Sequence, residues 1–269
     1  MQAFGSLGAF CLGFLVTRVL ESDALSFPAN YGILFILSFV LFMGSFASIA
    51  LVKEPPGKVY KEAEPFAQFL RRLPEYLKRE PVFVRIVAKI FLIGLSGLAL
   101  PFYVVYAKEI LGLPVSAAGY FISAQTLGSV VGGLFWGYMG HSRGYRRVIG
   151  YVGIAQALAP ATALSAALLP FTSGRLTLML LAYFFLGIGA SGWSVGTNCI
   201  LETVPPQDLA VYTALSSTMQ IPLFLAPFVG GFIVTTAGYG VVFILAAALP
   251  ALAQAGSLPT KSFPASIET

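Results

Sequence analysis

The chain has 269 residues, of which 57% are hydrophobic and only 10% are charged, and its mean hydropathy is +0.84. An ordinary soluble domain is excluded, because a soluble fold needs charged side chains spread over its surface. The charges that give the net +5 lie in a few clusters between long uncharged runs, as at the ends of membrane spans. We therefore predict an all-α bundle that crosses a membrane several times.

Eight transmembrane helices are predicted from the uncharged runs, because hydrocarbon about 30 Å thick is crossed by roughly 20 apolar residues of helix. Two helices precede a charged segment and six follow it, and the sequence TTAGYG separates the last two. The predicted helices are residues 4–20, 32–52, 86–107, 115–138, 148–169, 176–201, 209–234 and 239–257. In the seventh of them, Pro222 and Pro227 should kink the helix near mid-membrane.

The charged segment, residues 53–85, carries half of the chain's lysines and arginines. Apolar residues between Phe66 and Leu77 follow helical spacing with basic residues among them, which predicts a short interfacial helix bent at Pro74. A solvated linker with some local helix is the alternative. Lys89, shortly after this segment, is expected to extend its amine to the lipid headgroups.

The basic residues fall mostly on one side of the predicted membrane. The richer side holds those of segment 53–85 together with Arg143, Arg146, Arg147 and Lys261, whereas the other side holds Arg18, Lys108 and Arg175. By the positive-inside rule the richer side is cytoplasmic, and so are both termini. Topology thus accounts for the net charge, and no nucleic-acid partner is expected.

Glycines at helical spacing indicate where membrane helices pack closely, because lipid provides no hydrophobic drive for helices to associate. Gly128, Gly132 and Gly137 lie in predicted helix 115–138, and Gly187 lies in predicted helix 176–201. We interpret these residues as packing seams. The functional alternative is that they let helices slide past one another.

The stretch GYMGHSRGYRR, residues 137–147, resembles the signature cytoplasmic turn of major facilitator superfamily transporters, G-x-L-x-D-R-x-G-R-R in outline. The resemblance rests on Gly137, Met139, Gly144, Arg146 and Arg147, and the family's aspartate is replaced by His141. Two further stretches are similar to parts of the second bundle of that family, LETVPPQDLAVYTALSSTMQ (201–220) and PFYVVYAKEILGLPVSAAGYFISAQTLGSVVGGLFWGYM (101–139).

This resemblance implies two six-helix bundles joined by a long cytoplasmic loop. Residues 1–52 would be the last two helices of the first bundle, and residues 53–85 the central loop. Residues 86–258 would be the complete second bundle and 259–269 a cytoplasmic tail. Four more helices would precede Met1 in a complete transporter, so the resemblance implies a truncated product, a fragment, or one half of a split protein with a partner chain.

The implied function is secondary active or facilitative transport of a small solute by alternating access at the plasma membrane, with efflux of an amphipathic or drug-like compound as the favoured substrate hypothesis. No ionisable residue is predicted near mid-membrane, so proton coupling would need residues absent from this chain. Alternatives are a half without transport activity of its own and a non-transporting membrane protein such as a multi-pass enzyme or scaffold. No catalytic motif, metal site or cofactor site is predicted; the single histidine lies in the basic turn.

Polar residues predicted near mid-span are candidates for a solute pathway, because polar groups at that depth are costly and often functional. A structural role in hydrogen bonding between helices is the alternative for each of them. The pathway candidates are Tyr103, Gln125, Trp193, Ser194, Asn198 and Gln220.

A second set of candidates concerns a cytoplasmic gate implied by the family resemblance. Arg146 or Arg147, on a turn shaped by Gly137 and Gly144, should lie near Glu202 or Asp208 and close the inner side in one state. The alternative is that both arginines bind anionic lipid headgroups.

Overall fold

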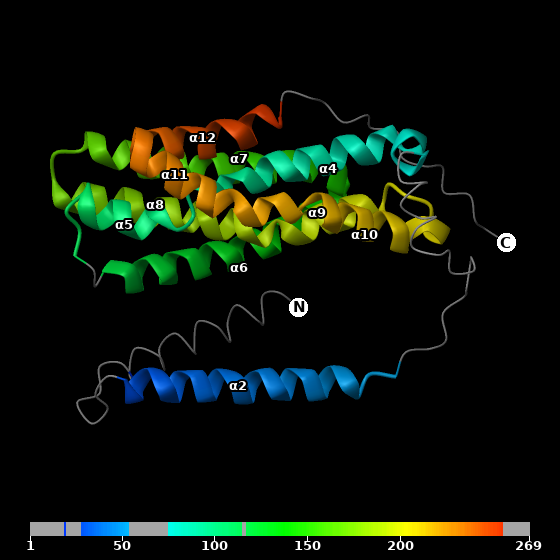
Figure 1. Ribbon diagram of the computed structural model, residues 1–269, viewed down its shortest axis with the longest axis horizontal. Coiled ribbons are helices and arrows are strands. Elements are labelled where there is room, and N and C mark those ends of the chain that lie inside the picture. The colour runs from blue at the N-terminus through cyan, green and yellow to red at the C-terminus, as the bar shows by residue number, and fades with distance from the viewer. Residues whose placement is uncertain (1–18, 20–27, 54–74, 115–116, 255–269) are drawn as a thin grey trace. The chain divides into compact units, whose positions relative to one another are not determined.

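A computed structural model describes residues 19, 28–53, 75–114 and 117–254 of the chain (Figure 1). All regular structure in these residues is helical, as predicted. The chain divides into one unit of residues 4–63 and a second formed chiefly by residues 64–269.

In the first unit the described element is α2, Ala29–Ala50, an apolar helix of 22 residues that is long enough to cross a membrane. It corresponds to predicted helix 32–52. Predicted helix 4–20 lies almost wholly outside the described residues. So does the predicted interfacial helix before Pro74, although residues 75–79 are helical.

The described residues of the second unit form six helical segments, in the same chain order as the six membrane helices predicted after residue 85. The segments are α4 (Pro81–Gly94), η1 (Leu95–Leu98) and α5 (Phe102–Glu109); α6 (Ala117–Arg143); α7 (Tyr145–Ser165) and η2 (Ala166–Leu168); α8 (Thr172–Ser191) and α9 (Trp193–Leu201); η3 (Pro206–Asp208), α10 (Leu209–Met219), η4 (Ile221–Leu225) and α11 (Ala226–Ala237); and α12 (Tyr239–Leu252). Among the described residues, five stretches including α2 are long and apolar enough to cross a membrane, and α12 is a shorter apolar helix.

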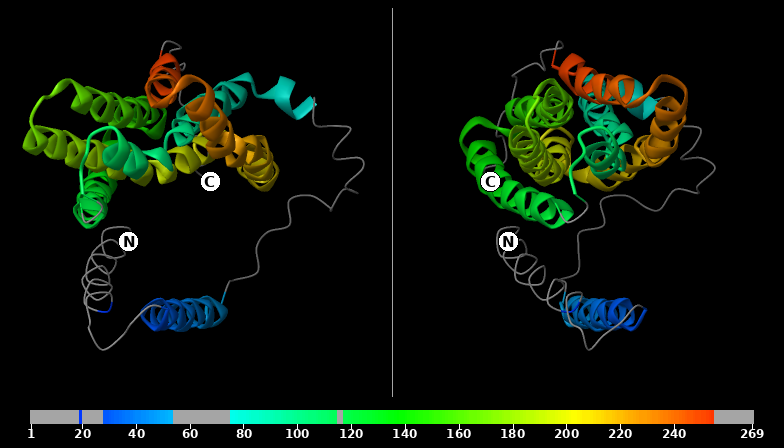
Figure 2. Two further views of the ribbon diagram at one scale, coloured as in Figure 1. Left: turned by 60° about the vertical axis from the view of Figure 1, so that its left-hand side comes forward. Right: turned by 90° about the vertical axis from the view of Figure 1, so that its left-hand side faces the viewer.

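The six segments form one bundle, which the right-hand view of Figure 2 shows nearly end-on. Helix α8 packs against α6 on one side and α7 on another, and α12 packs against α7. Two apolar clusters fill the interior. One contains Tyr103, Tyr183 and Phe243, and the other contains Phe83 and Tyr212, which pack edge to face with their ring centroids 4.8 Å apart.

Glycines create the close approach between α6 and α8. A Cβ atom on Gly128 would meet the backbone carbonyl of Phe184, and one on Gly187 would meet the carbonyl of Gln125. The packing seam expected at these positions is therefore present. A Cβ on Gly137 would meet no atom within 4 Å, so this glycine takes no part in the seam.

Three of the predicted helices are interrupted. The expected kink at Pro222 is present, because α10 ends before this residue and the tighter η4 follows. The break at η1 precedes Pro101, whose missing N–H and bulky ring disfavour a continuous helix. A further break at Gly192 separates α8 from α9 and was not predicted.

The prediction that Lys89 extends to the headgroups is wrong. Helix α4 begins at Pro81, inside the segment assigned to the central loop, so Lys89 already lies more than two turns into the helix. It shares the inward face with Phe83, Ile86 and Ile93, and the residue is only 9% exposed.

Candidate functional site

A cavity of about 220 Å³ lies inside the second unit, between α4, α7, the α8–α9 break and the α10–η4 break. Its lining mixes aliphatic residues with hydroxyl and amide side chains, and none of the described residues that line it is charged. The polar lining residues are Gln156, Thr197, Thr213, Ser216, Ser217 and Gln220.

The helix breaks position this cavity. Gly94 ends α4, Gly192 separates α8 from α9, and Gln220 follows the last residue of α10, and all three line the cavity. A Cβ on Gly94 would lie 2.5 Å from the side chain of Leu223, and one on Gly192 would meet Val152. Because these two glycines have no side chain, the interrupted segments approach each other closely. The hollow between them would be filled by side chains if the helices were regular and fully packed.

Gln220 is the most constrained polar residue of the cavity. Its Nε2 donates to the backbone oxygen of Ser216 at 3.2 Å and to Ser216 Oγ at 3.1 Å. Its Oε1 is buried without a hydrogen-bond partner among the described residues. Because a buried acceptor without a partner costs free energy, Gln220 holds hydrogen-bonding capacity that the described part of the chain does not use.

On the opposite side of the cavity, Gln156 of α7 packs its side chain against Gly189 of α8. Ser96 Oγ donates to Gln156 Oε1 at 3.4 Å. The cavity therefore has an amide on α7 and another at the end of α10.

The structure brings two of the six pathway candidates to the cavity. Trp193 and Gln220 line it, although Trp193 is 70% exposed and so lies at the rim. Ser194 does not line it, and its Oγ donates to the backbone oxygen of Ser191 at 3.3 Å. Asn198 is half-buried on the same helix and also lies outside the lining.

The other two pathway candidates lie elsewhere in the bundle. Tyr103 is 1% exposed in an aromatic cluster, with its ring centroid 4.9 Å from that of Phe243 and 5.7 Å from that of Tyr183. Gln125 lies on the seam between α6 and α8, where its carbonyl oxygen accepts from Ser129 Oγ at 3.1 Å.

Sequence reasoning missed Gln156 and the hydroxyl residues of the cavity. Gln156 satisfies the criterion that selected Gln220, a polar residue near the middle of a predicted span, so the signal was present. Thr213, Ser216 and Ser217 lie nearer the end of their span, and only the break after Met219 brings them to the cavity.

The basic turn packs against the end of α9. Gly144 separates α6 from α7 with a φ of 78°, a backbone conformation that favours glycine. The backbone N–H of Tyr145 donates to Glu202 Oε2 at 3.2 Å, and Arg146 Nε donates to Thr203 Oγ1 at 3.3 Å. Thr203 Oγ1 in turn donates to the carbonyl of Cys199 at 2.6 Å.

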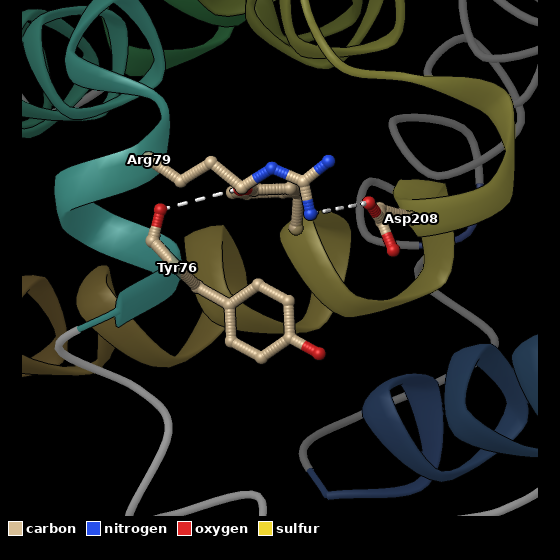
Figure 3. Close-up of polar contacts among 4 residues, drawn as sticks. Tyr76, Arg79 and Asp208 are labelled. Carbon is tan, nitrogen blue, oxygen red and sulfur yellow. Dashed lines mark hydrogen bonds and ion pairs between the residues drawn. The ribbon is translucent and has the colours of Figure 1, made fainter.

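The two gate candidates Asp208 and Arg147 lie apart from these contacts. Asp208 is 1% exposed, and its Oδ2 lies 3.6 Å from Nη1 of Arg79, on the short helix before α4 (Figure 3). On that helix the carbonyl of Tyr76 accepts from Tyr212 Oη at 3.2 Å. Arg147 is exposed at the start of α7.

Residues 90–264 match the family model described as the Major Facilitator Superfamily. No curated protein matches the chain. The matched range begins in α4 and takes in the cavity, the basic turn and the described residues from 90 to 254.

Proposed function

Because this chain belongs to the Major Facilitator Superfamily, a family of membrane transporters, we propose that it moves a small solute across the plasma membrane by alternating access. The observation that carries the proposal is the cavity among α4, α7, α9 and η4. It lies where three membrane segments are interrupted, and interrupted helices commonly form the binding sites of secondary transporters.

The lining of the cavity favours an uncharged or amphipathic solute. Ile90, Val152 and Leu223 offer apolar contacts, Trp193 offers an aromatic surface at the rim, and Gln220 offers hydrogen bonding. A carboxylate or phosphate solute would need a cation, and no charged residue is among those that line the cavity in the described part of the chain. We propose efflux of such a compound as the direction of transport.

The proposed orientation has both termini and the basic turn in the cytoplasm, according to the positive-inside rule. Rocking of two bundles around a central site needs helices besides the six of the second unit. We propose that α2 and further helices, in the same polypeptide or in a partner chain, complete the transport path. Proton coupling, if present, would use ionisable groups outside the cavity lining.

The proposal is tested by flux measurements on the full chain in proteoliposomes, with the amphipathic fluorescent probe Hoechst 33342, with and without a pH gradient. Gln220→Leu should lower the flux about fivefold, since one hydrogen bond to the solute contributes roughly 1 kcal/mol. Gln125→Leu is the matched control and should leave the flux within about twofold of the wild type, because Gln125 lies outside the cavity. Equal losses in both variants, or no protein-dependent flux of Hoechst 33342 when the helices that complete the path are present, would contradict the proposal.

A further inference from the structure

An open groove of about 690 Å³ runs between α7 and α12, which lie side by side in Figure 1. Alanines such as Ala161 and Ala248 form its floor, and larger side chains such as Ile154 and Ile244 stand beside them. The small floor residues between larger walls create the hollow. None of the described residues that line this groove also lines the cavity of the proposed solute site.

The groove lies on the exposed surface of the second unit. Ile154 is 46% exposed, Leu158 41% and Ile244 55%. The first two belong to a helical stretch long and apolar enough to cross a membrane, and Ile244 belongs to the shorter apolar helix α12. Among the described residues that line the groove, one is polar, Gln254, and its Nε2 already donates to the carbonyl of Pro250 at 3.0 Å. In a bilayer, such a surface contacts the hydrocarbon of the lipids. The groove therefore suits an acyl chain.

Arg147 lies on the same face of α7 as the groove. Ile154, Leu158 and Ala161 line the groove, and they follow Arg147 after roughly two, three and four turns of helix, a spacing that returns to one side of a helix. Two turns of helix span about 10 Å, so the guanidinium lies near the membrane edge when the groove lies in hydrocarbon. Arg147 is exposed, and its side chain makes no hydrogen bond or ion pair with the described residues. Neighbouring Arg146, in contrast, donates to Thr203.

We propose that Arg147 and the groove between α7 and α12 bind one anionic phospholipid, with the phosphate on Arg147 and an acyl chain along the alanine floor. A guanidinium binds phosphate through paired N–H donors, and basic sites between membrane helices at the cytoplasmic side select anionic headgroups. The positive charge of Arg147 favours an anionic lipid as the occupant of the groove. A helix of a second copy would also pack on alanines, but it would leave Arg147 without an anion.

The test uses the purified full chain in detergent, titrated with dioleoyl phosphatidylglycerol or dioleoyl phosphatidylcholine, with bound lipid counted by native mass spectrometry. The wild type should retain one phosphatidylglycerol in preference to phosphatidylcholine. Arg147→Gln should weaken phosphatidylglycerol binding about fivefold and remove the preference, the loss expected for one arginine near an anionic lipid. Arg143→Gln, which removes another exposed arginine at the end of α6, should keep the preference.

Two further measurements separate the lipid from other occupants. Ala161→Phe, which fills the groove from an exposed position, should weaken binding of both lipids, and glycerol 3-phosphate, which has no acyl chain, should not compete. The proposal is overturned if Arg147→Gln and Arg143→Gln behave alike, or if glycerol 3-phosphate competes. It is also overturned if the lipid-free chain is a dimer that Ala161→Phe dissociates, because a second copy would then occupy the groove.

Discussion

Asp208 is the most deeply buried acidic or basic residue in the described part of the second unit. It is 1% exposed and lies at the N-cap position of α10, whose N-terminal end favours a negative charge. The side chain of the facing Arg79 is 57% exposed, so solvent screens its part of the ion pair. The environment of Asp208 therefore depends more on the helix end than on Arg79.

This asymmetry predicts unequal effects of two neutral substitutions. Asp208→Asn should destabilise the chain by about 1–2 kcal/mol, since it removes a buried negative charge from a helix end that favours one. Arg79→Gln should cost less than about 1 kcal/mol, as expected for an exposed partner. Thermal unfolding of the purified protein in detergent measures both. A larger loss for Arg79→Gln would show that the ion pair dominates.

At the scale of elements, the α6–α8 seam gives the sharpest prediction. Gly128→Ala should destabilise the bundle by about 1–3 kcal/mol, because the added methyl group meets the carbonyl of Phe184 and forces the helices apart. Gly137→Ala, on the same helix in open space, should be neutral or slightly stabilising. The two variants are compared by measuring the fraction of each protein that stays monodisperse on heating. A gain in stability at both positions would mean that helix propensity, not packing, governs them, and equal losses would mean that the α6–α8 contact does not distinguish Gly128 from Gly137.

The sequence predicts the membrane segments well because each needs a long apolar run, and that requirement is local. It also predicts the break at Pro222, because the ring and the missing N–H of proline disfavour a continuous helix. The rule is not absolute, since Pro160 lies inside the continuous helix α7. The break at Gly192 has no such local cause. Gly192 has an ordinary right-handed backbone with φ of −71° and ψ of −5°, and the close approach of Val152 from α7 needs the absence of a side chain there.

The candidate site is less predictable than the fold because depth in the membrane does not reveal which way a side chain faces. Gln125 and Gln220 both lie near mid-span, yet Gln125 lies on a packing seam and Gln220 lines the cavity. Tyr103 was selected for its position and is buried among aromatic rings. Lys89 was assigned to the headgroups from its distance to Arg85, while the face of α4 that carries it turns inward. The direction in which a side chain faces depends on contacts between segments that are far apart in the sequence.

For the whole molecule, the arginines at the two ends of the second unit differ in exposure and hydrogen bonding. At one end, Arg143 and Arg147 are exposed, where lipid and solvent reach them. At the other end, Arg175 donates to the carbonyl of Leu169 at 2.8 Å and to that of Leu111 at 3.1 Å. Arg175 therefore acts as a link between two helix ends. The prediction of orientation itself depends on the larger number of Lys and Arg residues at the end that carries Arg143 and Arg147.

That asymmetry predicts which end of the second unit faces the cytoplasm. Ser142 and Ser173 are both exposed and lie beyond opposite ends of the α7–η2 segment. That segment has 24 residues, a length of about 36 Å as helix. In a background of Cys11→Ala and Cys199→Ala, a membrane-impermeant maleimide should label Ser173→Cys on intact cells. It should label Ser142→Cys only after the cells are permeabilised. Because serine to cysteine is nearly isosteric and removes no charge, neither variant biases the orientation that it reports. The reverse labelling pattern would place the basic turn outside the cell and refute the proposed topology.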